Sequence, residues 1–227
     1  MRVLYPQTCC FCGKICGSDI CHECEKEIEY ISKPVCDKCG KPITYGEGQL
    51  CFDCSKQPMF YEQGRSLWLH KGPVKQGIYQ FKYHNRRYYG LYYADELYRC
   101  HEETIRQWGI DVIIPLPLHR KRKRKRGYNQ AEIVARQLGK RMGILVDTRA
   151  VVRSKYTTAQ KELSHSERKQ NVRDAFEVVR MKEKVKNILI IDDIYTTGST
   201  INELSRILRK KGDFRVFFLT ISIGQGF

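Results

Sequence analysis

The sequence has no apolar run long enough to cross a membrane and no apolar stretch before its first cysteines. Its longest apolar run, Val216 to Ile223, contains Thr220 and Ser222 and is far shorter than the roughly 18 residues of a spanning helix. The first eight residues also lack the apolar region of a secretory signal. These absences predict a protein without a membrane span that resides in the cytoplasm, where thiols stay reduced.

The glycine fingerprint G-x-G-x-x-G, which marks dinucleotide-binding sites, is also missing. Disorder is not expected, because 41% of the residues are hydrophobic and 11% are aromatic. A chain of 227 residues can build one or two compact domains without disulfide staples. The sequence therefore predicts a folded protein whose chemistry differs from that of a dinucleotide-dependent enzyme.

Cysteine and charge are distributed unevenly along the chain. Residues 1–60 contain ten of the 11 cysteines and carry 7 Lys+Arg against 8 Asp+Glu, a net charge of −1. Residues 61–227 carry a net charge of +17. This change in composition predicts a cysteine-rich module over residues 1–57 and a basic main domain over residues 58–227.

The cysteines of the first module form four Cys-x2-Cys pairs: Cys9 and Cys12, Cys21 and Cys24, Cys36 and Cys39, and Cys51 and Cys54. Two such pairs supply the tetrahedron of thiolates that Zn²⁺ prefers, so the eight residues are predicted to bind two structural zinc ions. Sequential and crossed pairing of the turns fit the spacing equally well. A disulfide framework and a redox Cys-x-x-Cys site are the alternatives, which reduced thiols disfavour.

Three further cysteines lie outside these pairs. Cys10 and Cys16 either replace a zinc ligand or pack in the module. Cys100 is expected to be a buried packing residue. Because a closed four-thiolate site has no open position for a substrate, the reactive chemistry is expected in the main domain.

The clearest motif of the main domain is Ile-Leu-Ile-Ile-Asp-Asp-Ile-Tyr-Thr-Thr-Gly-Ser-Thr over residues 188–200. It predicts a buried parallel strand that ends at Asp192 and Asp193, a loop, and an amphipathic helix over residues 201–208. Hydroxyl groups, a glycine and the N–H groups of a helix start suit a phosphate group, and carboxylates suit sugar hydroxyls. A ribose 5-phosphate carries both groups. The alternative is a buried strand that ends in a solvated acidic turn.

This motif resembles the signature of the type I phosphoribosyltransferases, which bind 5-phosphoribosyl-1-pyrophosphate (PRPP). The resemblance implies an α/β fold with a central, mostly parallel sheet and flanking helices. It implies that Asp192 and Asp193 are catalytic and face the ribose hydroxyls, directly or through Mg²⁺. It further implies that the 5′-phosphate is held by Thr196, Thr197, Gly198, Ser199 and Thr200.

Residues 111–119 predict a second apolar strand that ends in prolines, and seven basic residues follow at 120–126. This segment resembles the pyrophosphate loop of glutamine PRPP amidotransferase, although the glutaminase part of that enzyme is absent. The resemblance implies that PRPP also contacts Pro117, Leu118, His119 and Arg126.

Local patterns predict further elements of the main domain. Asn129 and Glu132 predict a capping box at the start of a helix that ends near Met142. The remaining expected elements are a helix within 86–108 and strands at 175–179 and 214–223.

Taken together, the four cysteine pairs, the proline loop and the acidic signature resemble the ComF family over essentially the full chain. Its members are phosphoribosyltransferase-like proteins with an amino-terminal zinc ribbon, and some are associated with uptake of single-stranded DNA during natural competence. By this resemblance, Gln160, Arg168 and Asn171 belong to a flexible loop that closes over PRPP. A plain surface connection is the alternative for that segment.

The basic run at 120–126 has several interpretations. It is a solvated surface, or it binds anions, with one or two side chains on pyrophosphate and the others on a nucleic-acid backbone. Aromatic residues among cations at 79–89 favour single-stranded DNA, whereas tyrosines at helical spacing favour a core. We expect a PRPP-binding phosphoribosyltransferase-family protein. The alternatives are a non-catalytic adaptor that joins single-stranded DNA to a DNA-translocating competence helicase, and a regulator that senses PRPP.

Overall fold

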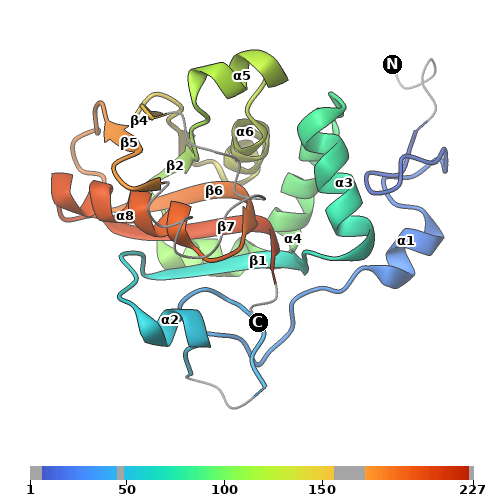
Figure 1. The fold of residues 1–227 in the computed structure, drawn as a ribbon, viewed down its shortest axis with the longest axis horizontal. Coiled ribbons are helices and arrows are strands. Elements are labelled where there is room, and N and C mark those ends of the chain that lie inside the picture. The colour runs from blue at the N-terminus through green and yellow to red at the C-terminus, as the bar shows by residue number, and fades with distance from the viewer. Residues whose placement is uncertain (1–6, 45–48, 156–171, 225–227) are drawn as a thin grey trace.

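The computed structural model of the protein describes residues 7–44, 49–155 and 172–224. Figure 1 shows their arrangement. The helices are α1 (His22–Glu27), α2 (Phe52–Lys56), α3 (Gly72–Tyr83), α4 (Tyr89–Trp108), α5 (Arg120–Arg126), α6 (Gln130–Met142) and α8 (Ser199–Lys211). The strands are β1 (Gln63–Leu69), β2 (Val112–Pro115), β3 (Leu145–Val146), β4 (Val151–Arg153), β5 (Phe176–Val178), β6 (Asn187–Tyr195) and β7 (Arg215–Ile223).

Five strands form a parallel sheet in the order β1-β7-β6-β2-β3. In the register of this sheet, Ile191 of β6 lies opposite Pro115 of β2. The carboxyl ends of β2 and β6 therefore meet at one edge, where parallel α/β sheets bind their ligands. The register brings the predicted proline loop next to the acid pair, and the expected α/β fold is confirmed.

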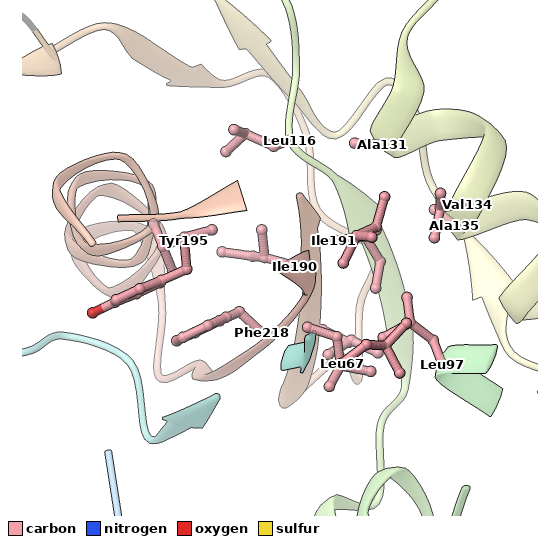
Figure 2. Close-up of a cluster of buried hydrophobic side chains, with 14 of the residues drawn as sticks. Leu67, Leu97, Leu116, Ala131, Val134, Ala135, Ile190, Ile191, Tyr195 and Phe218 are labelled. Atoms are coloured by element: carbon pink, nitrogen blue, oxygen red, sulfur yellow. The ribbon is translucent and has the colours of Figure 1, made fainter. Parts of the chain in front are cut away.

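Helices cover both faces of the sheet. Helices α4 and α6 pack on one face, whereas α8 packs on the other. Figure 2 shows the alternation that this requires: Ile190 points toward the side of α8, and Ile191 points toward α6. Both side chains are fully buried. The near-continuous apolar run of β6 is the pattern of a strand that is covered on both faces.

Strand β6 is longer than the sequence predicts. The expected end at Asp192 and Asp193 is wrong, because β6 continues to Tyr195. Asp192 pairs with Thr220 of β7, and Tyr195 pairs with Ile223. The ladder to β7 thus holds the acid pair on the sheet itself.

The open side of edge strand β1 is covered by the chain that follows α1. The Ile31 N–H donates to the carbonyl of Leu67 at 2.9 Å, and the Leu69 N–H donates to the carbonyl of Glu29 at 3.2 Å. An unpaired strand edge promotes association with other chains, so this cover protects the sheet. Among the described residues, no helix is both long and apolar enough to cross a membrane.

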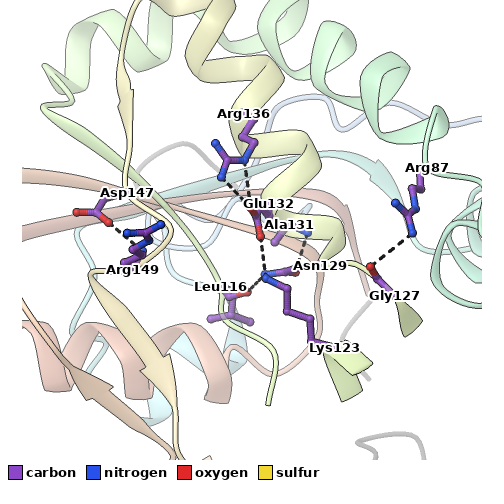
Figure 3. Close-up of polar contacts among 10 residues, drawn as sticks. All are labelled: Arg87, Leu116, Lys123, Gly127, Asn129, Ala131, Glu132, Arg136, Asp147 and Arg149. Atoms are coloured by element: carbon purple, nitrogen blue, oxygen red, sulfur yellow. Dashed lines mark hydrogen bonds and ion pairs between the residues drawn. The ribbon is translucent and has the colours of Figure 1, made fainter. Parts of the chain in front are cut away.

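Most of the other predicted elements are confirmed. Helix α4 occupies the expected segment, α6 ends at Met142, β7 fills 215–223, and β5 pairs with β4 in a small antiparallel sheet. The capping box is only half right. Asn129 caps α6 by accepting from the Ala131 N–H at 3.2 Å, but Glu132 turns to Lys123 and Arg136, as Figure 3 shows.

Candidate functional site

The two predicted acids lie side by side near the end of β6. The Asp192 carboxylate accepts a hydrogen bond from the Asp193 N–H at 2.8 Å. The Asp193 carboxylate forms an ion pair with the ammonium group of Lys82, at 2.6 Å, and only 13% of its side chain is exposed. The ion pair connects β6 to the last turn of α3.

Burial and the neighbouring charge of Asp193 raise the pKa of Asp192 to about 7. The positive charges of Lys82 and Arg153 act in the opposite direction. Asp192 therefore gains or loses a proton near neutral pH. Carboxylate oxygens of this kind are ligands that Mg²⁺ accepts, so the residues present fit the predicted ion.

The loop after β6 turns into α8 through Gly198. This glycine has φ +74° and forms the amino-terminal cap of the helix. A Cβ atom at Gly198 would lie 2.3 Å from the Tyr195 hydroxyl oxygen, so no side chain fits there. Thr197 and Ser199 share a hydroxyl hydrogen bond of 2.8 Å beside the turn, and Thr196 and Thr200 are half-buried. Together, these hydroxyl groups and the amino-terminal end of the 13-residue helix α8 form a polar surface with a positive electrostatic potential.

The predicted proline loop follows β2. Pro117, Leu118 and His119 are half-buried, and His119 Nδ1 caps α5 by accepting from the Lys121 N–H at 3.2 Å. The Asn129 side chain donates to the carbonyl of Leu116 at 3.0 Å and so ties the loop to α6 (Figure 3).

The basic run folds as helix α5, which the sequence did not predict. Most of its cations are exposed, and Arg120, Lys123, Arg124 and Gly127 line a surface depression of about 540 Å³. Arg126 is half-buried, with its guanidinium 5.2 Å from the centre of the Tyr83 ring. The side chain of Arg126 therefore extends from α5 toward the end of α3.

Sequence reasoning did not assign Lys82 or Arg153 to this site. Lys82 lies in the segment 79–89 whose pattern favours DNA contact, and only the fold shows that it reaches Asp193. Arg153 is buried at the end of β4, 5.4 Å from the Phe176 ring, and burial lowers its pKa to about 10. Predicted Gln160 and Arg168, together with Asn171, lie outside the described residues.

The eight paired cysteines gather in two clusters. Cluster 1 contains Cys9, Cys12, Cys21 and Cys24, and cluster 2 contains Cys36, Cys39, Cys51 and Cys54. In each cluster the four sulfur atoms lie within 4.8 Å of one another. Thiolates about 2.3 Å from one zinc ion lie roughly 3.8 Å apart in a tetrahedron, which fits these positions. The pairing is therefore sequential, the alternative that spacing alone could not select.

Each cluster repeats one design. Its first pair lies on a turn closed by a glycine of positive φ, Gly13 or Gly40, and its second pair stands at the start of a short helix. Cys10 and Cys16 belong to neither cluster. The prediction that Cys100 is buried is wrong, because this thiol is exposed on α4.

This parallel sheet, its acid pair and the glycine turn before α8 define an α/β domain of the phosphoribosyltransferase type, joined to a module with two four-cysteine clusters that fit Zn²⁺. Residues 1–55 match the double zinc ribbon domain, and residues 96–218 match the phosphoribosyl transferase domain. The chain therefore belongs to the phosphoribosyl transferase family, in the ComF group that also carries an amino-terminal double zinc ribbon.

Three relatives illustrate this group. Competence protein F of Haemophilus influenzae is 35% identical over 145 residues, which cover 62% of this chain and 63% of that protein. DNA utilization protein YhgH of Escherichia coli K12 is 33% identical over 45% of this chain and 44% of its own length. Competence protein ComFC of Bacillus subtilis is 31% identical over 44% of this chain and 39% of its own length. The matches thus span between about two fifths and just under two thirds of these relatives.

Among solved structures, UMP synthase of Leishmania donovani aligns with 61% of this chain and 22% of its own chain, at 19% identity and a TM-score of 0.33. A similarity of this size says nothing about substrates.

Proposed function

We propose that the protein binds PRPP together with Mg²⁺ at the carboxyl ends of β2 and β6. The observation that carries the proposal is the acid pair on β6 directly before a glycine turn that opens α8. Asp192 and Asp193 would hold the ribose hydroxyls, and residues 196–200 would hold the 5′-phosphate through hydroxyl and N–H groups. The proposed domains are residues 1–57 and 58–227.

The pyrophosphate end of PRPP would lie toward the loop of Pro117, Leu118 and His119, where α5 supplies positive charge. Mg²⁺, when bound, would neutralise charge on the departing pyrophosphate. Two cations are well placed to hold phosphate oxygens. Lys82 pairs with Asp193, and Arg126 lies over the ring of Tyr83 at the end of α3. Such a site acts by electrostatics and positioning, without a dedicated general base.

Titration calorimetry with PRPP and MgCl₂ tests this proposal. We expect the wild-type chain to bind PRPP and the Asp192→Asn/Asp193→Asn variant to bind at least tenfold more weakly. Asp95→Asn is the matched control, because this carboxylate pairs with Arg141 on α6, away from the acid pair. An absence of binding by the wild-type chain would overturn the proposal. In a separate assay, release of pyrophosphate with transfer of the phosphoribosyl group to water or to an added amine or nucleobase would distinguish a transferase from a PRPP sensor.

A second candidate function is contact with single-stranded DNA along α5, in keeping with relatives named for competence and DNA utilization. Tyr79 and Tyr83 are exposed on α3 with their rings 5.0 Å apart, and Arg126 of α5 lies over Tyr83. Cations beside exposed aromatic rings are typical of single-strand binders. We propose that this DNA contact occurs in the cytoplasm during DNA uptake, with a DNA-translocating helicase as the protein partner.

The salt dependence of oligothymidine binding tests the second candidate. The logarithm of affinity falls with the logarithm of salt concentration, and each lost phosphate contact reduces the magnitude of this slope by about 0.7 for single strands. We expect Lys123→Gln/Arg124→Gln to lower this slope. Lys210→Gln/Lys211→Gln, at the far end of α8, removes equal charge from exposed positions and should leave the slope nearly unchanged. Equal effects of the two variants would refute a site on α5.

A further inference from the structure

Cluster 2 is joined to the end of β6 by a short chain of buried polar atoms. The Tyr61 hydroxyl lies 3.8 Å from the Cys54 sulfur and 2.8 Å from the Tyr195 hydroxyl. Both tyrosines are fully buried. Two contacts through Tyr61 therefore connect Cys54, the last cysteine of cluster 2, to Tyr195, the last residue of β6.

Tyr195 in turn supports the glycine turn of the proposed phosphate site. Its hydroxyl and ring carbons would lie within 3 Å of a Cβ atom at Gly198, so the turn rests directly on this side chain. The Tyr195 ring is stacked on Phe218 at 4.9 Å with an interplanar angle of 3°, and Tyr61 meets Phe218 edge-on. Figure 2 shows Tyr195 and Phe218 together on the side of α8. Because the Tyr195 ring is closely packed, a displacement of its hydroxyl group would also displace the turn at Gly198.

A second connection runs from the chain after cluster 2 to the first turns of α8. The Asn202 side chain accepts from the Phe60 N–H at 2.6 Å and donates to the carbonyl of Pro58 at 3.2 Å. The Lys38 ammonium group, between the ligands Cys36 and Cys39, donates to the carbonyl of Tyr61 at 3.3 Å. The helix start and cluster 2 therefore hold the same segment, residues 58–61, from opposite sides.

A bound zinc ion would set the direction of the hydrogen bonds in this chain. A zinc-bound Cys54 thiolate has no proton and can only accept, so the Tyr61 hydroxyl must donate to sulfur. The Tyr61 oxygen then accepts from Tyr195. Without the metal, the Cys54 sulfur is no longer held by the ion, and the contact chain through Tyr61 loses its fixed end.

We propose that Tyr61 is a positioning residue that couples the zinc ion of cluster 2 to phosphate binding at the Gly198 turn. The inference rests on the proposed binding of PRPP. Coupling between two sites is reciprocal, so zinc in cluster 2 strengthens PRPP binding, and bound PRPP strengthens the binding of that zinc by the same free energy. A more tightly bound zinc ion is expected to leave more slowly. Cluster 1 has no such connection among the described residues and serves as an internal reference.

The test measures zinc release from the full chain to a chromogenic chelator, with and without PRPP and Mg²⁺. A Cys21→Ser variant identifies the kinetic phase that belongs to cluster 1. We expect PRPP to slow the cluster 2 phase about fivefold or more, within the usual range of such couplings, and to slow the cluster 1 phase by about threefold or less. Tyr61→Phe should keep its zinc content but lose most of this protection.

Tyr93→Phe is the matched control. It removes the hydroxyl of another buried tyrosine, which donates to the carbonyl of Cys10 at 2.7 Å beside cluster 1. This variant should retain the protection by PRPP. Should Tyr61→Phe fail to fold, Tyr195→Phe breaks the same chain at its other end. Calorimetric PRPP binding without slower zinc release would overturn the coupling, whereas an absence of PRPP binding would overturn the proposed function instead.

Discussion

The two zinc clusters have the same ligands and the same local design, but they are anchored in different ways. Cluster 1 is held mainly by apolar packing: Phe11, inside its first turn, is fully buried, with its ring 5.3 Å from Trp68. The backbone of residues 10–11 also rests on Gly77 of α3, where a Cβ atom would lie 2.5 Å from the Cys10 oxygen. Cluster 2 is held by polar contacts, since the Gly64 N–H of β1 donates to the carbonyl of Lys38 at 2.7 Å.

This difference matters because each cluster stands behind a different half of the proposed site. Cluster 1 packs on α3, the helix that carries Lys82 to Asp193. Cluster 2 reaches the glycine turn through Tyr61 and Tyr195. In Figure 1, α1 lies beside α3, whereas α2 lies below β1. Identical metal chemistry can thus support the carboxylate half of a site in one place and the phosphate half in another.

Removing one ligand from each cluster gives the largest expected contrast. Cys39→Ser and Cys21→Ser should each lower the zinc content by about one ion per chain, as measured by plasma mass spectrometry. Coupling between two sites commonly changes affinity about 5- to 150-fold, and we expect Cys39→Ser to weaken PRPP binding about tenfold. Cys21→Ser should weaken it about threefold or less. Equal losses in calorimetry would contradict the assignment of the phosphate half to cluster 2.

The turn glycines offer a smaller and more closely matched contrast. Gly40 and Gly13 have φ values of +73° and +80°, so alanine adds similar backbone strain at both positions, about 1–2 kcal/mol. The surroundings differ, because a Cβ at Gly40 would lie 2.8 Å from the backbone oxygen of Gly64, whereas at Gly13 it would lie 3.1 Å from the movable end of Gln80.

We therefore expect Gly40→Ala to destabilise the fold by about 1–2 kcal/mol more than Gly13→Ala. For a chain of this size, that is a melting temperature roughly 2–8 °C lower in scanning calorimetry. A Gly13→Ala variant that melts at or below the temperature of Gly40→Ala would show that cluster 1 is docked as rigidly as cluster 2.

The sequence alone was sufficient for features that local patterns encode. Ligand spacing indicated the two zinc sites, and the apolar run before Asp192 indicated the central strand, because both signals lie within short segments. It could not select the pairing of the turns, because the sequential and crossed arrangements have the same spacings. Tyr61 and Lys82 were missed for a related reason: their partners, Tyr195 and Asp193, lie more than 100 positions away in the chain.

Two of the wrong predictions also have physical causes. Cys100 lies near the buried residues Leu97 and Ile105 in the sequence, but the buried face of α4 passes through half-buried His101 and leaves the thiol exposed. Glu132 has the spacing of a capping box, yet Lys123 and Arg136 offer it full charges. Ion pairs of this kind compete with a neutral N–H for the same carboxylate.

The pH dependence of PRPP binding gives the smallest effect and separates the two halves of the site. With its pKa raised to about 7, Asp192 keeps a proton in the free folded protein well above the ordinary value of 3.8. Stability from this group is therefore complete below about pH 4 and is lost as pH rises through 7. Binding of Mg²⁺ and PRPP requires the carboxylate, so affinity should rise by about tenfold in total between pH 6 and pH 8.

Because the Lys82 ammonium lowers the pKa of Asp192, Lys82→Met should move the midpoint of this rise to higher pH. Calorimetric titrations at several pH values, compared with the wild-type chain, cancel the ionisation of PRPP itself. Cys21→Ser should shift the midpoint in the same direction, since cluster 1 supports the helix that carries Lys82. Cys39→Ser should lower affinity at every pH and leave the midpoint in place. A midpoint shift in Cys39→Ser but not in Cys21→Ser would reverse the assignment of the clusters to the two halves of the site.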